Sequence, residues 1–416
     1  MRAYFKDKKV LKNCKIYQML SANARGRHIS FHAPGHKKGA WDITELSFSD
    51  NLSSPKGCIA EAEKDIADVL GASKSYILTD GSTSGVLSML YTAKGLGVKT
   101  LFILGQAHKS VWNGCRLLGI TPLFENGVEE ADGIFCTSPD YYGQIANLKG
   151  LRAFCDKENK LLLIDGAHGG HLHFQKEIYA GSYADFWVDG VHKSLPALTQ
   201  GAVVSAKSKE GANALYQGVQ YFRTTSPSYP IMASVEYAVK YPRNIKMEAC
   251  ARAFAEKFQD RVYLGADYTK LCVLFGQNAF EAEKYLQKKG IYAEFCDGNV
   301  IVFYLSPATK KREWRALTKA LSRLLLQFPY TPQKELERIP APLVFDKNAT
   351  AEWRKIDECA GKICAGDCGL FPPCTPLIQK GERIEREKLD LIKKANNAYG
   401  VWENKILVYK EEENAR

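Results

Sequence analysis

The sequence predicts an α/β protein with a mostly parallel sheet in a large domain, followed by a smaller C-terminal α+β domain. From about Ile66 to Lys207, short β-rich runs alternate with helical stretches, which is the pattern of a parallel sheet. The β-rich runs are apolar throughout, as expected of strands that helices cover on both faces. After about Tyr241 this alternation ends. We therefore expect an N-terminal segment, a large domain and a C-terminal α+β domain at residues 1–40, 41–241 and 242–416.

The large domain is expected to contain six strands and the helices between them. The strands are Tyr76–Thr79, Thr100–Leu104, Gly133–Cys136, Leu161–Ile164, Phe186–Val188 and Ala202–Ser205. Helices are expected from Gly85 to about Lys94, from near Lys109, and over Ala146–Asn159. Ligands of such sheets bind at the carboxyl ends of the strands, so the residues that follow each strand are the candidate site.

The C-terminal part of the chain predicts shorter, mixed elements. The expected elements are helices at Ala279–Lys289 and from Arg312 to about Gln327, and a β-pair of Tyr292–Phe295 and Val300–Leu305 joined by the turn-rich Cys296–Asn299. The Pro-rich segment Leu370–Pro376 is expected to be rigid and non-helical.

The charge of the chain does not indicate a nucleic-acid partner. The formal net charge is +11 over 416 residues, but the Lys and Arg residues are spread along the chain and no nucleic-acid-binding signature accompanies them. We interpret the charge as a solvated surface that would also attract an anionic cofactor or substrate. No apolar run suits a signal peptide or a membrane span, so we expect no membrane association.

The cysteines indicate a cytoplasmic protein with reduced thiols. There are twelve, and their spacing does not resemble a disulfide framework. Four of them cluster near the C-terminus, at Cys359, Cys364, Cys368 and Cys374. Their gaps differ from the paired C-x2-C knuckles of common zinc sites, so we interpret them as small buried side chains and expect no metal.

A candidate phosphate site follows the first expected strand. The sequence from Asp80 to Gly85 reads Asp-Gly-Ser-Thr-Ser-Gly and directly precedes a helix. Small hydroxyl residues and glycines at a helix N-terminus offer backbone N–H groups, side-chain donors and a favourable dipole to a phosphate. Ser82, Thr83 and Ser84 are therefore candidate phosphate ligands. The alternative is that they only cap the helix.

Two further strand ends carry a carboxylate and a lysine. Asp165 precedes Gly166-Ala-His-Gly-Gly-His171, where the alternative is a capping Asp with a structural His. Lys193 follows His192 between two apolar strands, and a lysine in a sheltered cleft readily loses its proton and can form an imine. Pyridoxal 5'-phosphate (PLP) needs a lysine, an anion site, and a carboxylate beside its pyridine nitrogen. These three strand ends together predict PLP as the cofactor.

With these residues in place, the sequence resembles the Orn/Lys/Arg decarboxylase family, which has the aspartate-aminotransferase fold (PLP fold type I), and in particular its compact bacterial type. The resembling stretches are Phe31–Lys37, Asp42–Leu46, Gly81–Gly85, Ala107–Val111, Asp165–His171, His192–Gly201, Thr224–Tyr229, Phe371–Leu377 and Gly381–Ile384. The resemblance spans nearly the whole chain. It implies that residues 41–241 form a PLP-binding large domain.

The resemblance implies a role for each candidate residue. Lys193 would hold PLP as a Schiff base, Asp165 would pair with the ring nitrogen, and His108 would stack on the ring face; these three are the expected catalytic residues. The residues expected around the phosphate are Ser82, Thr83, Ser84 and His192. Ala167 and His168 would line the other side of the ring.

Several positions differ from the family pattern. Gly190 and Val191 stand where Ser or Thr usually precedes the lysine, and Gly166 stands where Glu is more common. Ser53 replaces a usual His, and Cys374 with Thr375 replaces a usual Gly-Ile. These differences leave open which amino acid is the substrate and whether activity is intact.

The implied reaction is the decarboxylation of arginine, lysine or ornithine to CO2 and an amine, in a homodimer or higher homo-oligomer. Asp42, Glu45 and Asp50 are candidates for recognising the cationic side chain, and Thr224–Tyr229 is a candidate contributor to a neighbour's site. Two alternatives stay open. One is an aminotransferase, lyase or aldolase of the same fold, and the other is a catalytically impaired paralogue with a binding or regulatory role.

Overall fold

A computed structural model describes residues 5–26, 29–37, 39–124, 127–330, 350–371, 374–395 and 397–410. The chain divides into two compact units. The first comprises Met1–Arg252, Leu264–Lys270 and Tyr304–Lys311, and the second comprises Ala253–Tyr263, Leu271–Phe303 and Arg312–Arg416. Because the units interleave along the chain, the expected domain boundaries at residues 40 and 241 stay predictions.

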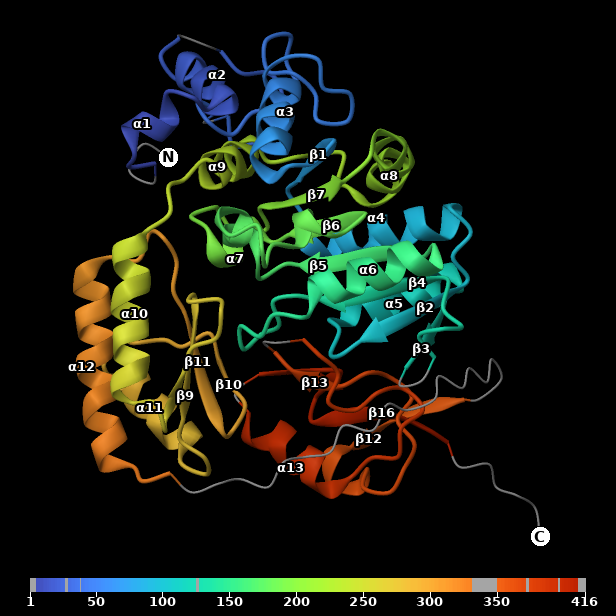
Figure 1. Ribbon diagram of the computed structural model, residues 1–416, viewed down its shortest axis with the longest axis vertical. Coiled ribbons are helices and arrows are strands. Elements are labelled where there is room, and N and C mark those ends of the chain that lie inside the picture. Colours follow the sequence, from blue (N-terminus) through green and yellow to red (C-terminus); the bar gives the residue numbers. More distant parts are fainter. Residues whose placement is uncertain are drawn as a thin grey trace. The chain divides into compact units, whose positions relative to one another are not determined.

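A seven-stranded sheet forms the centre of the first unit (Figure 1), with the strand order β1-β7-β6-β5-β4-β2-β3. The strands are β1 Lys74–Leu78, β2 Thr100–Leu104, β3 Thr121–Leu123, β4 Gly133–Thr137, β5 Leu161–Gly166, β6 Phe186–Asp189 and β7 Ala202–Ala206. Strands β3, β2, β4, β5 and β6 pair in parallel, whereas β7 runs antiparallel between β1 and β6. The sheet is therefore mostly parallel, which confirms the predicted fold class.

The six expected strands of this sheet are all present, with ends that differ by at most two residues. The seventh strand, β3, was not expected. It is three residues long, has Pro122 at its centre and pairs only with β2. Proline is tolerated at the edge of a sheet, because one side of an edge strand needs no N–H donor, so a short Pro-containing strand leaves little trace in an apolar pattern.

Helices cover both faces of the sheet. The helices of the first unit are α1 Lys8–Leu11, α2 Lys15–Asn23, α3 Cys58–Leu70, α4 Ser82–Gly95, α5 Lys109–Leu118, α6 Leu148–Glu158, α7 Val191–Ser194, α8 Lys209–Phe222 and α9 Tyr229–Val239. Apolar residues of α4, α5 and α8 pack with Phe135 and Leu163 on one face. Residues of α3, α6 and α9 pack with Ile134 and Ile164 on the other. Two-sided burial explains why the strands are apolar at every position.

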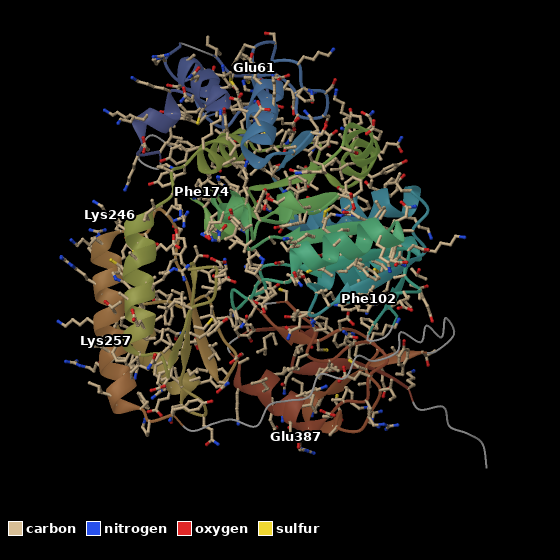
Figure 2. All side chains as sticks on the ribbon, in the orientation of Figure 1. Glu61, Phe102, Phe174, Lys246, Lys257 and Glu387 are labelled. Atoms are coloured by element: carbon tan, nitrogen blue, oxygen red, sulfur yellow. The ribbon has the colours of Figure 1, made fainter. Side chains whose placement is uncertain are left out.

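Figure 2 shows how side chains fill the space between these ribbons, with Phe102 of β2 labelled. Phe102 is 8% exposed and belongs to the cluster that also holds Ile134 and Ile164.

No helix among the described residues is long and apolar enough to cross a lipid bilayer.

A four-stranded sheet of order β10-β11-β9-β8 follows along the chain. Its strands and the neighbouring helices are α10 Ile245–Lys257, β8 Val262–Tyr263, β9 Lys270–Leu274, α11 Ala279–Lys288, β10 Phe295–Cys296, β11 Val300–Tyr304 and α12 Lys311–Gln327. The expected strand Tyr292–Phe295 is wrong over most of its length. The strand begins only at Phe295 and includes Cys296, which was assigned to the turn.

The C-terminal elements are β12 Ala351–Lys355, β13 Gly369–Leu370, α13 Arg386–Lys394, β14 Ala398–Tyr399, β15 Val401–Trp402 and β16 Lys405–Tyr409. Strands β12, β16 and β15 form one small sheet, and β13 pairs with β14. Of the expected rigid Leu370–Pro376 segment, Pro372 and Pro373 lie outside the described residues. The cysteines Cys364 and Cys368 are buried here with their Sγ atoms 4.0 Å apart, and no metal-binding cluster is found in the described part of the chain.

Candidate active site

The candidate site lies at the carboxyl edge of the seven-stranded sheet. Strand β7 is antiparallel to both β1 and β6, so β1 and β6 run in the same direction as β5, β4 and β2. The segments that follow β1, β2, β5 and β6 therefore emerge at one edge. Asp165 lies at the end of β5 itself, and the four segments carry the other residues predicted to be catalytic or to bind the cofactor, as the position of ligands in such sheets leads us to expect.

The N-terminus of α4 is open to a ligand. Its N-cap is Gly81, with φ +88°, which has no side chain that could cap the helix, and no other side chain is seen to cap it among the described residues. The backbone N–H groups of its first turn are therefore not satisfied by a cap, while Ser82 is half-buried and Thr83 is exposed. Gly85 in the same turn is required by packing, because a Cβ there would lie 2.6 Å from Cγ2 of Val188. Strand β6 and the helix N-terminus are thus in direct contact.

Ser84 differs from its two neighbours. Its hydroxyl is buried, with Oγ 2.8 Å from Oδ1 of Asp80 and 2.9 Å from the carbonyl oxygen of Gly81, so these two acceptors share its one proton. The other carboxylate oxygen of Asp80 accepts from the N–H of Thr224 at 2.9 Å. The Gly81 N–H also donates to the carbonyl of Gln200 at 2.9 Å, which ties the loop to the segment after Lys193. Ser84 therefore shapes the loop through its side chain, and only its backbone N–H is left for a ligand.

Asp165 is a buried carboxylate at the end of β5. It is 3% exposed and accepts a hydrogen bond from the N–H of Ala167 at 3.0 Å. Burial raises its pKa, and the Ala167 N–H and the charge of Lys193 partly offset that effect. A cationic donor beside this carboxylate would favour its ionised form.

Lys193 lies in α7 and reaches His168. Its Nζ is 3.1 Å from Nε2 of His168 and 5.8 Å from the centroid of the Tyr141 ring. The rings of His168 and Tyr141 are 4.5 Å apart, so they form one aromatic wall beside the amine. Tyr141 follows β4 and was not among the predicted site residues, because nothing in its own segment suggested chemistry.

His108 and His192 occupy separate positions at this edge. His108 is the N-cap of α5, and its Nδ1 lies 2.8 Å from Oγ of Ser110. Burial, followed by the charges of Lys193 and Lys109, lowers the pKa of His108 to about 3, so the ring is neutral at physiological pH. His192 is half-buried, and its Nδ1 lies 3.1 Å from the carbonyl of Gly201.

The structure explains two of the departures from the family pattern. A Cβ at position 190 would lie 2.4 Å from the carbonyl oxygen of Ala167, so Gly190 is the only residue that fits without moving the backbone. A Cβ at Gly166 would lie 3.0 Å from the carbonyl oxygen of Val188. A Cβ at position 166 would therefore require only a small shift of the Val188 carbonyl, whereas a Cβ at position 190 would require the backbone to move.

A second group of buried, charged residues lies next to His168. Nζ of Lys270 is 2.8 Å from Oδ2 of Asp267 and donates to the carbonyl of His168 at 2.7 Å. Oδ1 of Asp267 is 2.8 Å from Nε2 of His171. Nδ1 of His168 is 2.9 Å from the hydroxyl of Tyr304. Sequence reasoning missed Asp267, Lys270 and Tyr304, because they lie beyond the alternating region and follow no recognisable motif.

The proposed substrate-recognition carboxylates are not equivalent. Asp50 accepts from the N–H groups of Gly57 at 2.8 Å and Ile59 at 2.9 Å through Oδ2, and from those of Asn51 and Lys56 at 2.9 Å through Oδ1. Both oxygens are therefore used to hold the start of α3. Asp42 lies 3.0 Å from Nε2 of His36, and Glu45 accepts from the Thr44 hydroxyl at 2.6 Å.

Thr224–Tyr229 is held within its own chain at both ends. The N–H of Thr224 donates to Asp80, and Tyr229 is fully buried with its hydroxyl donating to the carbonyl of Asp50 at 2.6 Å. The Tyr229 side chain therefore contributes to the interior of this chain and is not available to a neighbouring one.

Comparison with known proteins identifies the family. The family model for the Orn/Lys/Arg decarboxylase major domain matches residues 40–136 and 129–264, together more than half of the chain. The chain belongs to the Orn/Lys/Arg decarboxylase family. The predicted family is thus confirmed, and with it the predicted enzyme class, an amino-acid decarboxylase (carboxy-lyase).

Three similar proteins match this decarboxylase over most of their length. The uncharacterized protein YaaO of Bacillus subtilis (strain 168) is 26% identical over 96% of this chain and 99% of its own. An arginine decarboxylase of the same organism is 25% identical over 91% of this chain and 92% of its own. The solved lysine decarboxylase LdcF of Francisella novicida is 16% identical, with a TM-score of 0.75 over 95% of this chain and 80% of that structure. The last comparison shows that the fold is shared.

Proposed function

We propose that this decarboxylase binds PLP at the carboxyl edge of the seven-stranded sheet, with Lys193 bonded to the cofactor's aldehyde carbon. The substrate is a basic amino acid, which loses its α-carboxylate as CO2 and leaves as an amine. The observation that carries the proposal is the position of Lys193. Its Nζ lies 3.1 Å from Nε2 of His168, and in its protonated form Lys193 lowers the pKa of both the buried Asp165 and His108.

The donor set at this edge fits PLP. The uncapped first turn of α4 supplies backbone N–H groups for the phosphate, together with the hydroxyls of Ser82 and Thr83, and the dipole of this 14-residue helix favours an anion there. Ser84 would contribute only its backbone N–H to the phosphate site, because its hydroxyl is hydrogen-bonded to Asp80. His192 would complete the phosphate site from the side of Lys193.

The remaining residues would hold the ring. The Asp165 carboxylate is buried and accepts one hydrogen bond, from Ala167, among the described residues, so it can still accept the N–H of a pyridinium ring. A neutral His108 would lie against one face of the ring, and Ala167 with His168 would line the other. Neutrality of His108 is favoured by the burial that lowers its pKa to about 3.

The mechanism divides the work among these groups. Bound PLP would supply an electron-accepting ring for the electron pair that remains when the carboxylate leaves. Asp165 would keep the ring nitrogen protonated by accepting its hydrogen bond, while His108 and the wall of His168 and Tyr141 would exclude water from the reacting carbon. Nε2 of His168 would hold Nζ of Lys193 by a hydrogen bond whenever Lys193 is not bonded to the cofactor.

We propose arginine first among arginine, lysine and ornithine. A relative named arginine decarboxylase matches the chain over nearly the full length of both proteins. A cationic side chain needs a carboxylate, and Asp50 is excluded from this task because both of its oxygens hold α3. Of the three carboxylates that the sequence suggests, Asp42 and Glu45 therefore stay as candidates for binding the cationic side chain of the substrate.

We also propose a cytoplasmic homodimer or larger homo-oligomer with a role in polyamine metabolism, to which the amine product belongs. Support for self-association comes from apolar side chains left exposed near the N-terminus, Ile29 at 88% and Phe31 at 91%. Support for a reducing compartment comes from the cysteines, all twelve of which lie in the described residues without forming a disulfide.

The proposal is tested by pairing a spectrum with product analysis. Purified protein supplied with PLP should show a visible absorbance band that Lys193→Ala abolishes and that the exposed control Lys246→Ala retains. The protein with the band should release CO2 from arginine, lysine or ornithine in stoichiometric yield with the amine. Formation of a keto acid instead would make it an aminotransferase, and a band without any turnover of the three substrates would make it an impaired paralogue.

A further inference from the structure

Both ring nitrogens of His168 are engaged by ionisable side chains. Nε2 lies 3.1 Å from Nζ of Lys193, and Nδ1 lies 2.9 Å from the hydroxyl of Tyr304. The ring is 2% exposed, and burial together with the charges of Lys193 and Lys270 holds the pKa of His168 well below its ordinary value. A neutral imidazole carries one N–H and one bare nitrogen, so the partner of one nitrogen decides what the other presents.

Tyr304 contacts His168 from outside the residues that the model of the family's major domain matches. It ends β11, whereas the family match covers residues 40–264. The N–H of the next residue, Leu305, donates to the carbonyl of Thr269 at 2.7 Å, which fixes Tyr304 beside the start of β9. The backbone next to Tyr304 is thus tied to the residue that precedes Lys270, which also contacts His168.

Lys270 contacts both Tyr304 and His168, in addition to the direct contact between these two residues. Its Nζ donates to the main-chain carbonyl of His168 at 2.7 Å and lies 4.9 Å from the centroid of the Tyr304 ring. A cation over the face of a phenol withdraws electron density from the ring and makes the hydroxyl a stronger hydrogen-bond donor. Tyr304 is therefore favoured as the donor to Nδ1.

The positive charge of Lys270, one of the two lysines near His168, is compensated by a carboxylate. The ionisable groups that act on the imidazole or contact it are Lys193, Lys270, Asp267, His108, Tyr141 and Tyr304. Asp267 lies 2.8 Å from Lys270 and compensates its charge. Lys193 is the ionisable group that faces Nε2, at 3.1 Å.

We propose that Tyr304 is a positioning residue that acts through His168. By donating to Nδ1, it keeps the imidazole proton on Nε2, which then donates to Nζ of Lys193. An N–H donor stabilises the lone pair of a neutral amine and disfavours an ammonium ion at the same position. Only a neutral amine attacks a carbonyl carbon, so the arrangement prepares Lys193 to form its bond with the cofactor. No proton is transferred in the resting arrangement.

This inference rests on the proposed role of Lys193, yet its first test needs no cofactor. Histidine-selective 15N labelling of the full chain gives signals from only eight histidines, and their long-range couplings report which ring nitrogen carries the proton. His168→Gln assigns the signal of interest. We expect the Nε2–H form in the native sequence, a mixture of both forms in Tyr304→Phe, and no change in Tyr292→Phe, whose tyrosine is 77% exposed. A native Nδ1–H form, or a form unchanged in Tyr304→Phe, would overturn the inference.

The second test measures the readiness of Lys193 itself. The cofactor-free chain is treated briefly with an amine-acylating reagent across a pH series, and modification of each lysine is followed by mass spectrometry. Because a hydrogen bond is lost, Tyr304→Phe should slow labelling of Lys193 by about five- to tenfold near neutral pH and move its pH midpoint upward, with Lys246 as the internal reference. Equal labelling of Lys193 in both proteins contradicts the inference. PLP binding is measured separately, so failure of the cofactor proposal would show as a missing Lys193-dependent band while the tautomer result stands.

Discussion

Asp189 gives the structure a pH dependence that a single substitution should remove. The residue ends β6 and is 1% exposed. Its Oδ2 accepts from the hydroxyl of Tyr179 at 2.6 Å and from Nε1 of Trp187 at 3.0 Å, whereas Oδ1 is buried without a hydrogen-bond partner among the described residues. Burial raises the pKa of Asp189 to about 7. The hydrogen bonds from Tyr179 and Trp187 lower this pKa in part, and the nearby charge of Asp165 raises it further.

The raised pKa means that the folded protein keeps a proton which the unfolded chain releases. Stability contributed by protonated Asp189 is therefore fully present below the unfolded pKa of about 3.9 and is lost progressively until the pH passes about 7. Between about pH 5.5 and about pH 8.5 this linkage removes roughly 2 kcal/mol of the free energy of unfolding. Asp189→Asn keeps an acceptor for Tyr179 and Trp187 but cannot ionise, so it should not show this loss.

Urea unfolding at these two pH values, followed by tryptophan fluorescence, measures the difference directly. The exposed carboxylate Asp68 provides the matched control, as Asp68→Asn should keep the pH dependence of the native sequence. The comparison cancels contributions from other buried acids, because they are common to all three proteins. If Asp189→Asn loses as much stability with rising pH as the native chain does, then Asp189 is ionised in the folded state and the reasoning is refuted.

Three further substitutions should act in stated directions. Gly190→Ser should destabilise the fold by roughly 1–3 kcal/mol in urea unfolding, because its Cβ would overlap the Ala167 carbonyl; an unchanged midpoint would show that the family's usual hydroxyl fits after all. Asp50→Ala should lower the free energy of unfolding by about 1–2 kcal/mol through loss of the α3 cap, with no change in KM for the amino acid. Asp267→Asn should cost roughly 3–5 kcal/mol, because Lys270 is left buried without its counter-charge. Adding Lys270→Met should restore most of that loss, and a double variant as unstable as the single one would contradict the ion-pair explanation.

The strands of the large domain could be predicted because burial on both faces leaves a direct mark on the sequence. Thr100–Leu104 is apolar at nearly every position and was located without error. Strand β10 could not be located in the same way. Only Phe295 and Cys296 pair with β11, and a two-residue strand has no period to detect.

The candidate site was predictable to the extent that it follows strand ends. Asp165 and Lys193 stand where the rule for parallel sheets places ligands, and Ser82 with Thr83 stands at an uncapped helix. The rule could not show that the Ser84 hydroxyl turns toward Asp80, since the same residue type serves as ligand or as internal donor.

Residues that reach the site through tertiary structure left no local signal. Tyr304 contacts His168 across 136 positions of sequence, and Lys270 does so across 102. Neither belongs to a motif, and the helices and strands around them were assigned to another domain. Asp50 shows the reverse case, in which a plausible substrate carboxylate proves to be the cap of α3.

The central claim is that Lys193 carries PLP, and chemical mapping of that bond tests it most directly. Protein supplied with PLP is reduced with borohydride, which makes a C=N bond permanent, and is then digested and analysed by mass spectrometry. We predict that the phosphopyridoxyl group is found on the peptide that contains Lys193, in near-stoichiometric amount, and is absent from Lys193→Ala. Recovery of the group on another lysine, or equal incorporation in Lys193→Ala, would contradict the account.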